Sequence, residues 1–308
     1  TGLPIITVEN ACASGTTAYH EARAAVESGR YGCVLALGVE HMSTRFDGPI
    51  APEPTDAEQA GGLLLPALYA LSASRYAAVH GTTPSDLAQV AVKNSGHGAR
   101  NPRAQRRRAL TEAEVLGSRP IAEPLTLFQC AGLTDAAAAA VLGPRRRRTR
   151  DIPIRASVLR SGRAWDQDSE RVWGFDVIRE TASEAYAQAG ITPEEVDLAE
   201  VHDAFTIGEL VTVEALGLAP EGRAAESVRD GEFTLGGRRP VNPSGGLLSR
   251  GHPLGATGLA QVAEAVWQLR EEAGPRQVEG ARTALVETMG GGASGLDANG
   301  CVVTVLGG

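Results

Sequence analysis

The sequence predicts an α/β protein made of two similar halves. In the first half, an apolar segment at residues 4–8 precedes a turn of small residues, a stretch with helical spacing and a second apolar segment at 33–39. In the second half, strand-like segments at 198–201, 283–286 and 301–306 alternate with helical patterns. Strands separated by helices favour a fold in which helices cover the faces of sheets.

Length, charge and cysteine content narrow the class of protein. A chain of 308 residues is long enough for two packed domains, and its net charge of -8 argues against a nucleic-acid partner. No apolar run reaches the ~18 residues of a membrane span. The cysteines are far apart and form no CxxC pair, so we expect no metal site and a reducing, cytoplasmic setting: Cys12, Cys33, Cys130 and Cys301.

The first half is expected to cover residues 1–150. Alanines recur at helical spacing after the small-residue turn at 10–15, which predicts a helix there. Residues 43–128 differ in character, because Gly and Pro interrupt polar segments. One helical pattern lies at 64–80 and another begins after Thr83. An insertion of this length predicts a loop domain with its own role, often that of a lid.

The second half is expected to cover residues 151–308. Before it, the alanine-rich run 136–142 fits either a helix or a buried strand, and its length does not decide between them. The arginine-rich run 145–150 is interpreted as a solvated linker and not as a phosphate site. A helix is expected at 176–188, and the Gly-rich turn 251–258 leads into an apolar helix.

Four positions could carry chemistry. Cys12 precedes a helix, whose dipole would lower the thiol pKa and favour the thiolate. His252 lies in a glycine-flanked turn, and His202 ends a strand. Gly290 begins a glycine triplet that could present a backbone N–H group to an oxyanion. On local features alone, an inert buried cysteine, two structural histidines and an ordinary turn remain alternatives.

The combination of motifs is more specific than any one of them. Five blocks occur in one order: Asn-Ala-Cys-Ala-Ser-Gly from Asn10, His-Asp-Ala-Phe from His202, Asn-Pro-Ser-Gly-Gly from Asn242, Gly-His-Pro-Leu-Gly-Ala-Thr-Gly from Gly251, and Gly-Gly-Gly from Gly290. Over essentially the whole chain, this pattern resembles the thiolase family, and most closely its sterol-carrier-protein-type branch. The resemblance implies a five-layered αβαβα fold, two similar α/β halves with an inserted loop domain, and a homodimer.

The resemblance also implies a role for each position. Cys12 would be the nucleophile that takes the acyl group from coenzyme A, and His252 the base that activates it. His202 would help to form a first oxyanion hole, while the backbone N–H groups of Cys12 and Gly290 would form a second. No cofactor would be bound permanently, because the coenzyme A thioester is the substrate. Further positions in the motifs are possible substrate contacts: Asn242, Ser244, Gly245 and Thr288.

Two departures from the family pattern matter. Thiolases carry a second Cys as acid/base, but Ala204 and Thr288 stand at the two places where it occurs. Tyr69 or His97 from the loop domain could substitute for it. The family also has two further βα units before the strand at 4–8, which are missing here. We therefore expect either that the sequence is a fragment or that another segment completes the sheet. These residues alone would have an open sheet edge and poor solubility.

Three functions are therefore considered. The leading one is acyl transfer through Cys12, with a C–C bond made or broken at a coenzyme A thioester. The second is a retro-aldol lyase that acts on a side-chain acyl-CoA with a small zinc-ribbon/OB-fold partner protein. The third is a non-catalytic acyl-CoA-binding subunit, against which the intact Cys12 and His252 argue.

Overall fold

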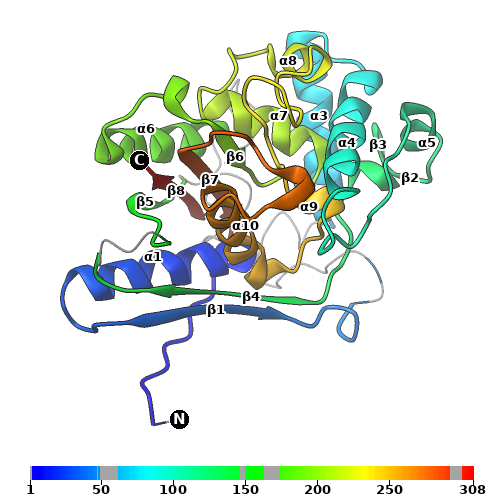
Figure 1. Ribbon diagram of the computed structural model, residues 1–308. Coiled ribbons are helices and arrows are strands. Elements are labelled where there is room, and N and C mark those ends of the chain that lie inside the picture. Colours follow the sequence, from blue (N-terminus) through cyan, green and yellow to red (C-terminus); the bar gives the residue numbers. More distant parts are fainter. Residues whose placement is uncertain (1, 47, 49–61, 146–149, 163–173, 292–299) are drawn as a thin grey trace.

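The computed structural model describes residues 2–46, 48, 62–145, 150–162, 174–291 and 300–308. These residues form two sheets that build the layers of the fold, and a separate two-stranded hairpin (Figure 1). In the smaller sheet, β1 (Val34–Glu40) pairs antiparallel with β4 (Ala136–Leu142), which decides the open question about residues 136–142 in favour of a strand. The larger sheet has the order β5-β8-β7-β6, with the strands β5 (Ile154–Ser161), β8 (Gly300–Gly307), β7 (Thr283–Gly290) and β6 (Leu198–Glu200).

Helices lie between and outside the sheets. The helices α1 (Ser14–Glu27) and α10 (Leu254–Leu269) contact both sheets and form a central layer between them (Figure 1). The helices α6 (Phe175–Ala189) and α7 (Thr206–Ala215) pack together on the outer side of the larger sheet. The described residues thus form successive β-α-β-α layers, which are four of the five predicted layers.

Glycines allow the central layer to pack closely. A Cβ atom added at Gly15 of α1 would lie 2.6 Å from the carbonyl oxygen of Gly255 in α10. One added at Gly258 would lie 2.5 Å from the Thr16 side chain. Since real side chains do not tolerate such distances, α1 and α10 can approach this closely only because these positions are glycine. This approach brings the segments before both helices together.

The inserted region has the predicted helices. These are α3 (Leu65–His80), α4 (Pro84–Gly98) and the short α5 (Glu112–Leu116), followed by the hairpin of β2 (Pro120–Ala122) and β3 (Leu125–Thr126). A capping box explains why α4 begins after Thr83: the Thr83 side chain accepts the Asp86 N–H group, and the Asp86 carboxylate accepts that of Thr83. The remaining helices are α8 (Ala224–Arg229), α9 (Gly246–Ser249) and four 3₁₀ turns: η1 (Ala11–Ala13), η2 (Leu127–Gln129), η3 (Pro193–Glu195) and η4 (Gly274–Arg276).

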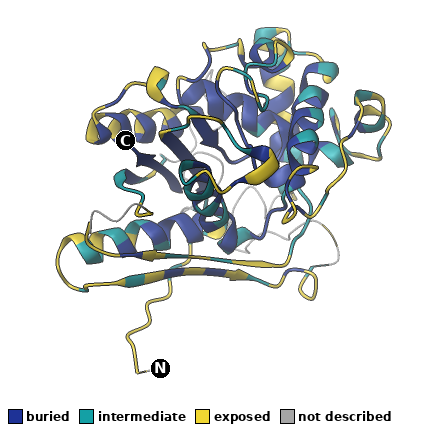
Figure 2. Cartoon of the chain, in the orientation of Figure 1, coloured by how far each residue is buried: buried dark blue, intermediate teal, exposed yellow. Residues whose placement is uncertain are grey.

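The strand predicted at residues 4–8 is wrong. This segment has no regular secondary structure, and Ile5 and Ile6 are 84% and 67% exposed. Its β-branched residues favour a strand, but a strand forms only where a neighbour pairs with its backbone, and the segment joins no sheet among the described residues. The outer face of the β1–β4 sheet is also exposed, including Leu35, Leu37 and Val39 (Figure 2).

A buried polar network joins α4 to the second half. The Lys93 ammonium lies 3.0 Å from a carboxylate oxygen of Glu209. The Asn94 amide donates to Asp203 at 2.7 Å and to Glu209 at 2.8 Å, and the Asn242 amide also donates to Glu209 at 2.8 Å. All five side chains are buried. Such a network is stable only when its charges are matched, so it defines one position for α4.

Among the described residues, no helix combines the length and the apolar character that crossing a membrane requires.

We predict that Lys93→Met destabilises the protein by about 3–5 kcal/mol, because the Glu209 carboxylate would stay buried without its cation. Equilibrium unfolding in urea measures this loss. The control is Arg223→Ala, which breaks the exposed ion pair with Glu226 and should change stability by less than about 0.5 kcal/mol. Equal stability of the two variants would contradict the role given to the network.

Candidate active site

Cys12 lies at a strained turn. It belongs to η1, directly before α1, and the preceding residue, Ala11, has a φ of 44°. This left-handed conformation costs an L-residue about 1–2 kcal/mol. The turn places Cys12 at the N-terminus of the central helix, next to the end of β7. Strain of this kind persists where the surrounding structure holds the backbone in place.

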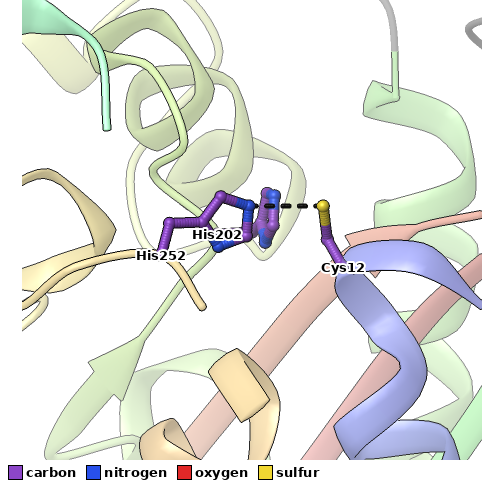
Figure 3. A group of neighbouring side chains, drawn as sticks. All are labelled: Cys12, His202 and His252. Carbon is purple, nitrogen blue, oxygen red and sulfur yellow. Dashed lines mark hydrogen bonds between the residues drawn. The ribbon is translucent and has the colours of Figure 1, made fainter. Parts of the chain in front are cut away.

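His252 contacts the Cys12 thiol. Its Nε2 atom lies 3.2 Å from the Cys12 Sγ atom, and its Nδ1 atom lies 2.8 Å from the Thr257 hydroxyl (Figure 3). Its backbone N–H group donates to the Thr134 hydroxyl at 3.1 Å. Burial lowers the pKa of His252 well below its usual value, so the ring is neutral at neutral pH. With the proton on Nδ1, Nε2 is positioned to accept the thiol proton.

His202 completes a compact group. Its ring meets that of His252 edge-on, with the centroids 5.1 Å apart (Figure 3). Its backbone N–H group donates to the Glu287 carboxylate at 2.9 Å. Burial, together with the positive charge of Arg250, lowers the pKa of His202 to about 3. The structure therefore brings together the three residues to which the sequence assigned catalysis. One donor atom from each lies within 4.8 Å of the others, a spacing that could also suit a metal ion.

The expected low pKa of Cys12 is not found. Burial, with a smaller effect of the negative charges of Glu40 and Glu9, raises the pKa of the thiol to about 12. The prediction of a stabilised thiolate is therefore wrong. Desolvation outweighs the helix dipole, and two neutral imidazoles supply no positive charge. A thiol in this state is protonated at neutral pH and becomes a nucleophile only when a base takes its proton.

Gly290 packs directly against the nucleophile. A Cβ atom added there would lie 2.7 Å from the backbone nitrogen of Cys12 and 2.8 Å from its Cβ atom. Only glycine fits at this end of β7. The backbone segments of Gly290 and Cys12 thus lie side by side. That they bind the oxyanion of a substrate stays a prediction.

The four possible substrate contacts are engaged within the protein. The Asn242 amide oxygen accepts the backbone N–H group of Val201 at 2.9 Å, and the Ser244 hydroxyl donates to Glu200 at 2.7 Å. The Thr288 hydroxyl donates to Gln261 at 2.6 Å. Gly245 packs against Gly98 of α4, where an added Cβ atom would lie 2.7 Å from the Gly98 Cα atom. These contacts give each residue a structural role beside the site, and their contact with substrate stays a prediction.

Of the two residues proposed as substitutes for the second Cys, only one lies at the site. The His97 ring is buried, with Nδ1 3.0 Å from the Asn242 carbonyl oxygen and Nε2 accepting the Leu235 N–H group at 3.0 Å. Both nitrogens are occupied, so His97 has none left for proton transfer. Tyr69 stacks on Phe205 with centroids 4.2 Å apart, and its pKa is raised by burial and by the proximity of Cys12. Of the two, Tyr69 is the one at the site.

Three features of the site were missed by sequence reasoning. Glu287 lies fully buried behind His202, and burial raises its pKa to about 7. A signal was available, since Glu287 is the one charged residue of the apolar strand β7. Thr257 orients His252, but in the sequence it stands out only as one residue of the Gly-rich motif. The third feature is a cavity beside His202 with a mostly apolar lining: Tyr69, Ser72, Ile178, His202, Ile207, Gly208, Val211, Thr212 and Met289.

Known proteins are similar to this chain in sequence and in fold. Residues 1–115 match the family model described as thiolase, N-terminal domain, and residues 162–299 match thiolase C-terminal domain-like. An acetyl-CoA acetyltransferase of Methanothermobacter thermautotrophicus is 42% identical over 298 residues, which are 94% of this chain and 78% of that protein. The chain therefore belongs to the thiolase family and has its fold.

Two further relatives bear on the function. Sterol carrier protein 2 of Gallus gallus is 40% identical over 315 residues, and the alignment spans 95% of this chain but 58% of that protein. A solved structure named Ltp2-ChsH2(DUF35) aldolase superposes with a TM-score of 0.77 at 27% identity, covering 97% of this chain and 78% of that one.

We predict that alkylation of Cys12 by iodoacetamide accelerates about tenfold per pH unit between pH 7 and pH 10, because a thiol with a raised pKa gains thiolate steadily over that range. Mass mapping of each cysteine measures the rates. An acyl-CoA should protect Cys12 but not Cys33, which is exposed and serves as the internal control. A rate at Cys12 that is already constant below pH 8 would indicate a thiolate and contradict the raised pKa.

Proposed function

We propose that this chain transfers acyl groups through a thioester on Cys12 and makes or breaks a C–C bond beside the carbonyl of a coenzyme A thioester. The observation that supports this most directly is the 3.2 Å contact between Cys12 Sγ and His252 Nε2, with His202 beside it. A neutral imidazole aimed at a protonated thiol is the arrangement that general-base activation requires.

The first half-reaction follows from this contact. The Cys12 sulfur attacks the thioester carbonyl while His252 Nε2 takes the thiol proton. The carbonyl oxygen becomes an oxyanion, which the backbone N–H groups of Cys12 and Gly290 would stabilise. When the intermediate collapses, the C–S bond to coenzyme A breaks and the leaving thiolate takes the proton from His252. The products are an acyl group on Cys12, free coenzyme A and a neutral imidazole.

The second half-reaction needs stabilisation of an enolate. Breaking or making a bond next to a thioester carbonyl places negative charge on that oxygen, and two imidazole rings beside the acylated cysteine can donate to it. A mostly apolar cavity no larger than a water molecule lies next to His202. Tyr69 lines this cavity and lies near Cys12, so it is the proposed acid in place of a second cysteine.

A retro-aldol lyase is the second candidate. It is favoured by the similarity to the structure named Ltp2-ChsH2(DUF35) aldolase. It is also favoured by Ala204 and Thr288, neither of which can act as an acid/base in the place of the second Cys. A small zinc-ribbon/OB-fold protein would then be a partner. For either activity we propose a cytoplasmic homodimer without a permanently bound cofactor. A non-catalytic acyl-CoA-binding subunit would bind the thioester without acylation of Cys12.

We predict that His252→Ala slows formation of the acyl-enzyme by about 10²–10⁴-fold, the usual worth of general-base help. His202→Ala should leave acylation measurable and impair the later step, since His202 faces the developing enolate. Single-turnover acylation with a labelled acyl-CoA separates the two effects. His41→Ala, at an exposed histidine, is the matched control. Equal loss of acylation in the His252 and His202 variants would contradict this division of roles.

We also predict slow thiolysis of acetoacetyl-CoA. Tyr69, whose pKa is raised by burial, exchanges protons less readily than a second cysteine would, so turnover should be about 10²–10⁴-fold below that of Ala204→Cys. The measurement is acetoacetyl-CoA cleavage by both proteins, with Cys12 acylation as the check that each is folded and reactive. Rapid wild-type turnover, with no gain from the added cysteine, would show that another group already supplies this help.

A further inference from the structure

The group around Cys12 has the composition of a metal site. The Cys12 sulfur and one ring nitrogen each from His202 and His252 lie within 4.8 Å of one another, and the closest pair is 3.2 Å apart. These donors come from three separate segments: η1, the loop after β6 and the loop before α10 (Figure 3). One thiolate and two imidazoles form a ligand set that Zn²⁺ accepts, with the fourth position open.

The distances fit a small ion after a modest movement. With Zn–S at about 2.3 Å and Zn–N at about 2.0–2.1 Å, neighbouring donors of a tetrahedral site stand about 3.3–3.6 Å apart. The present spacing therefore has to close by no more than about 1.5 Å. His202 has a ring nitrogen to offer, because its Nδ1 atom is buried and has no hydrogen-bond partner among the described residues. His202 as a whole is 4% exposed, and its buried Nδ1 atom lacks the solvent contact that would otherwise satisfy it.

The surroundings of the two histidines bear on the same occupant. The Thr257 hydroxyl holds the far side of His252, as an outer partner commonly does for a metal-binding histidine. Glu40 and Glu9 add negative charge near the sulfur. Arg250 adds positive charge near the two histidines, so the ligand set rather than the local field would hold the cation.

We infer that Cys12, His202 and His252 bind a thiophilic divalent cation, Zn²⁺ in the first place, and that the bound ion reversibly blocks acylation. Binding replaces the S–H bond of Cys12 by an S–Zn bond and releases one proton to solvent. The sulfur lone pair that would attack a thioester is then engaged by the metal. The inhibition rests on the proposed function, whereas the binding itself does not.

Cobalt is the probe for the binding site. We expect the reduced, metal-free protein to bind one Co²⁺ per chain with a thiolate-to-metal charge-transfer band, and Zn²⁺ to displace it. Cys12→Ser should abolish the band, and His202→Ala should weaken binding by at least about 100-fold. Thr257→Val should weaken it by about 10–100-fold, the usual cost of losing an outer partner. Cys33→Ser, at an exposed cysteine, should bind as the wild type does.

Two outcomes would overturn the inference: no stoichiometric Co²⁺ binding by the wild type, or the same affinity in His202→Ala. Wild-type protein alkylated at Cys12 should also lose the site, which tests the sulfur without any substitution. Labelled acyl-CoA separates this inference from the proposed function. The metal-free protein should acylate Cys12, and Zn²⁺ should stop this until a chelator removes the ion. Acylation by protein that binds no metal would refute the metal site alone, and metal binding by protein that is not acylated even when metal-free would refute the proposed activity alone. Acylation at an unchanged rate in the Zn²⁺-bound protein would refute the inhibition.

Discussion

The contact between the Cys12 thiol and the His252 ring depends on how closely α1 and α10 approach. The two residues are 240 positions apart and each precedes one of these helices, so the helix packing sets their distance. Gly15 and Gly258 remove the side chains that would hold the helices apart. Any larger residue there would move the base away from the thiol, although neither glycine touches either of them. The reactive geometry is thus a property of the central layer as much as of the two side chains.

Close packing also determines the electrostatics of the site. The same burial that fixes the two rings removes water from the thiol and from both imidazoles. It raises the pKa of Cys12 to about 12 and keeps His202 and His252 neutral. A neutral thiol facing a neutral base is less reactive toward oxidants than a thiolate would be. It forms a nucleophile only when a carbonyl accepts the sulfur while the base removes the proton.

The sequence predicts most of this architecture, and its failures share a cause. Periodicity locates α1, α4, α6 and most strands, and the ordered motifs identify Cys12, His202 and His252. It fails at residues 4–8, where an apolar segment has strand-like residues but no described strand to pair with. It gives the wrong direction for the Cys12 pKa, because desolvation depends on packing from distant segments. The sequence also does not show that Glu287 and Tyr69 lie close to the site, because this proximity comes from tertiary structure.

The two proposed uses of the site need opposite hydrogen-bonding states of the histidines. To stabilise an oxyanion a ring must present an N–H group, whereas to take up the thiol proton or a metal ion it must present a lone pair. Thr257 permits both states of His252, because a hydroxyl can accept a proton from Nδ1 or donate one to it. A carboxylate partner at this place would favour only the state with a proton on Nδ1. His202 is less constrained still, since no described residue bonds its Nδ1 atom. Because the partners of these rings are neutral, the rings are free to exchange tautomers. The same cluster can then fill each of its proposed roles: the base, the oxyanion hole and the ligands to a cation.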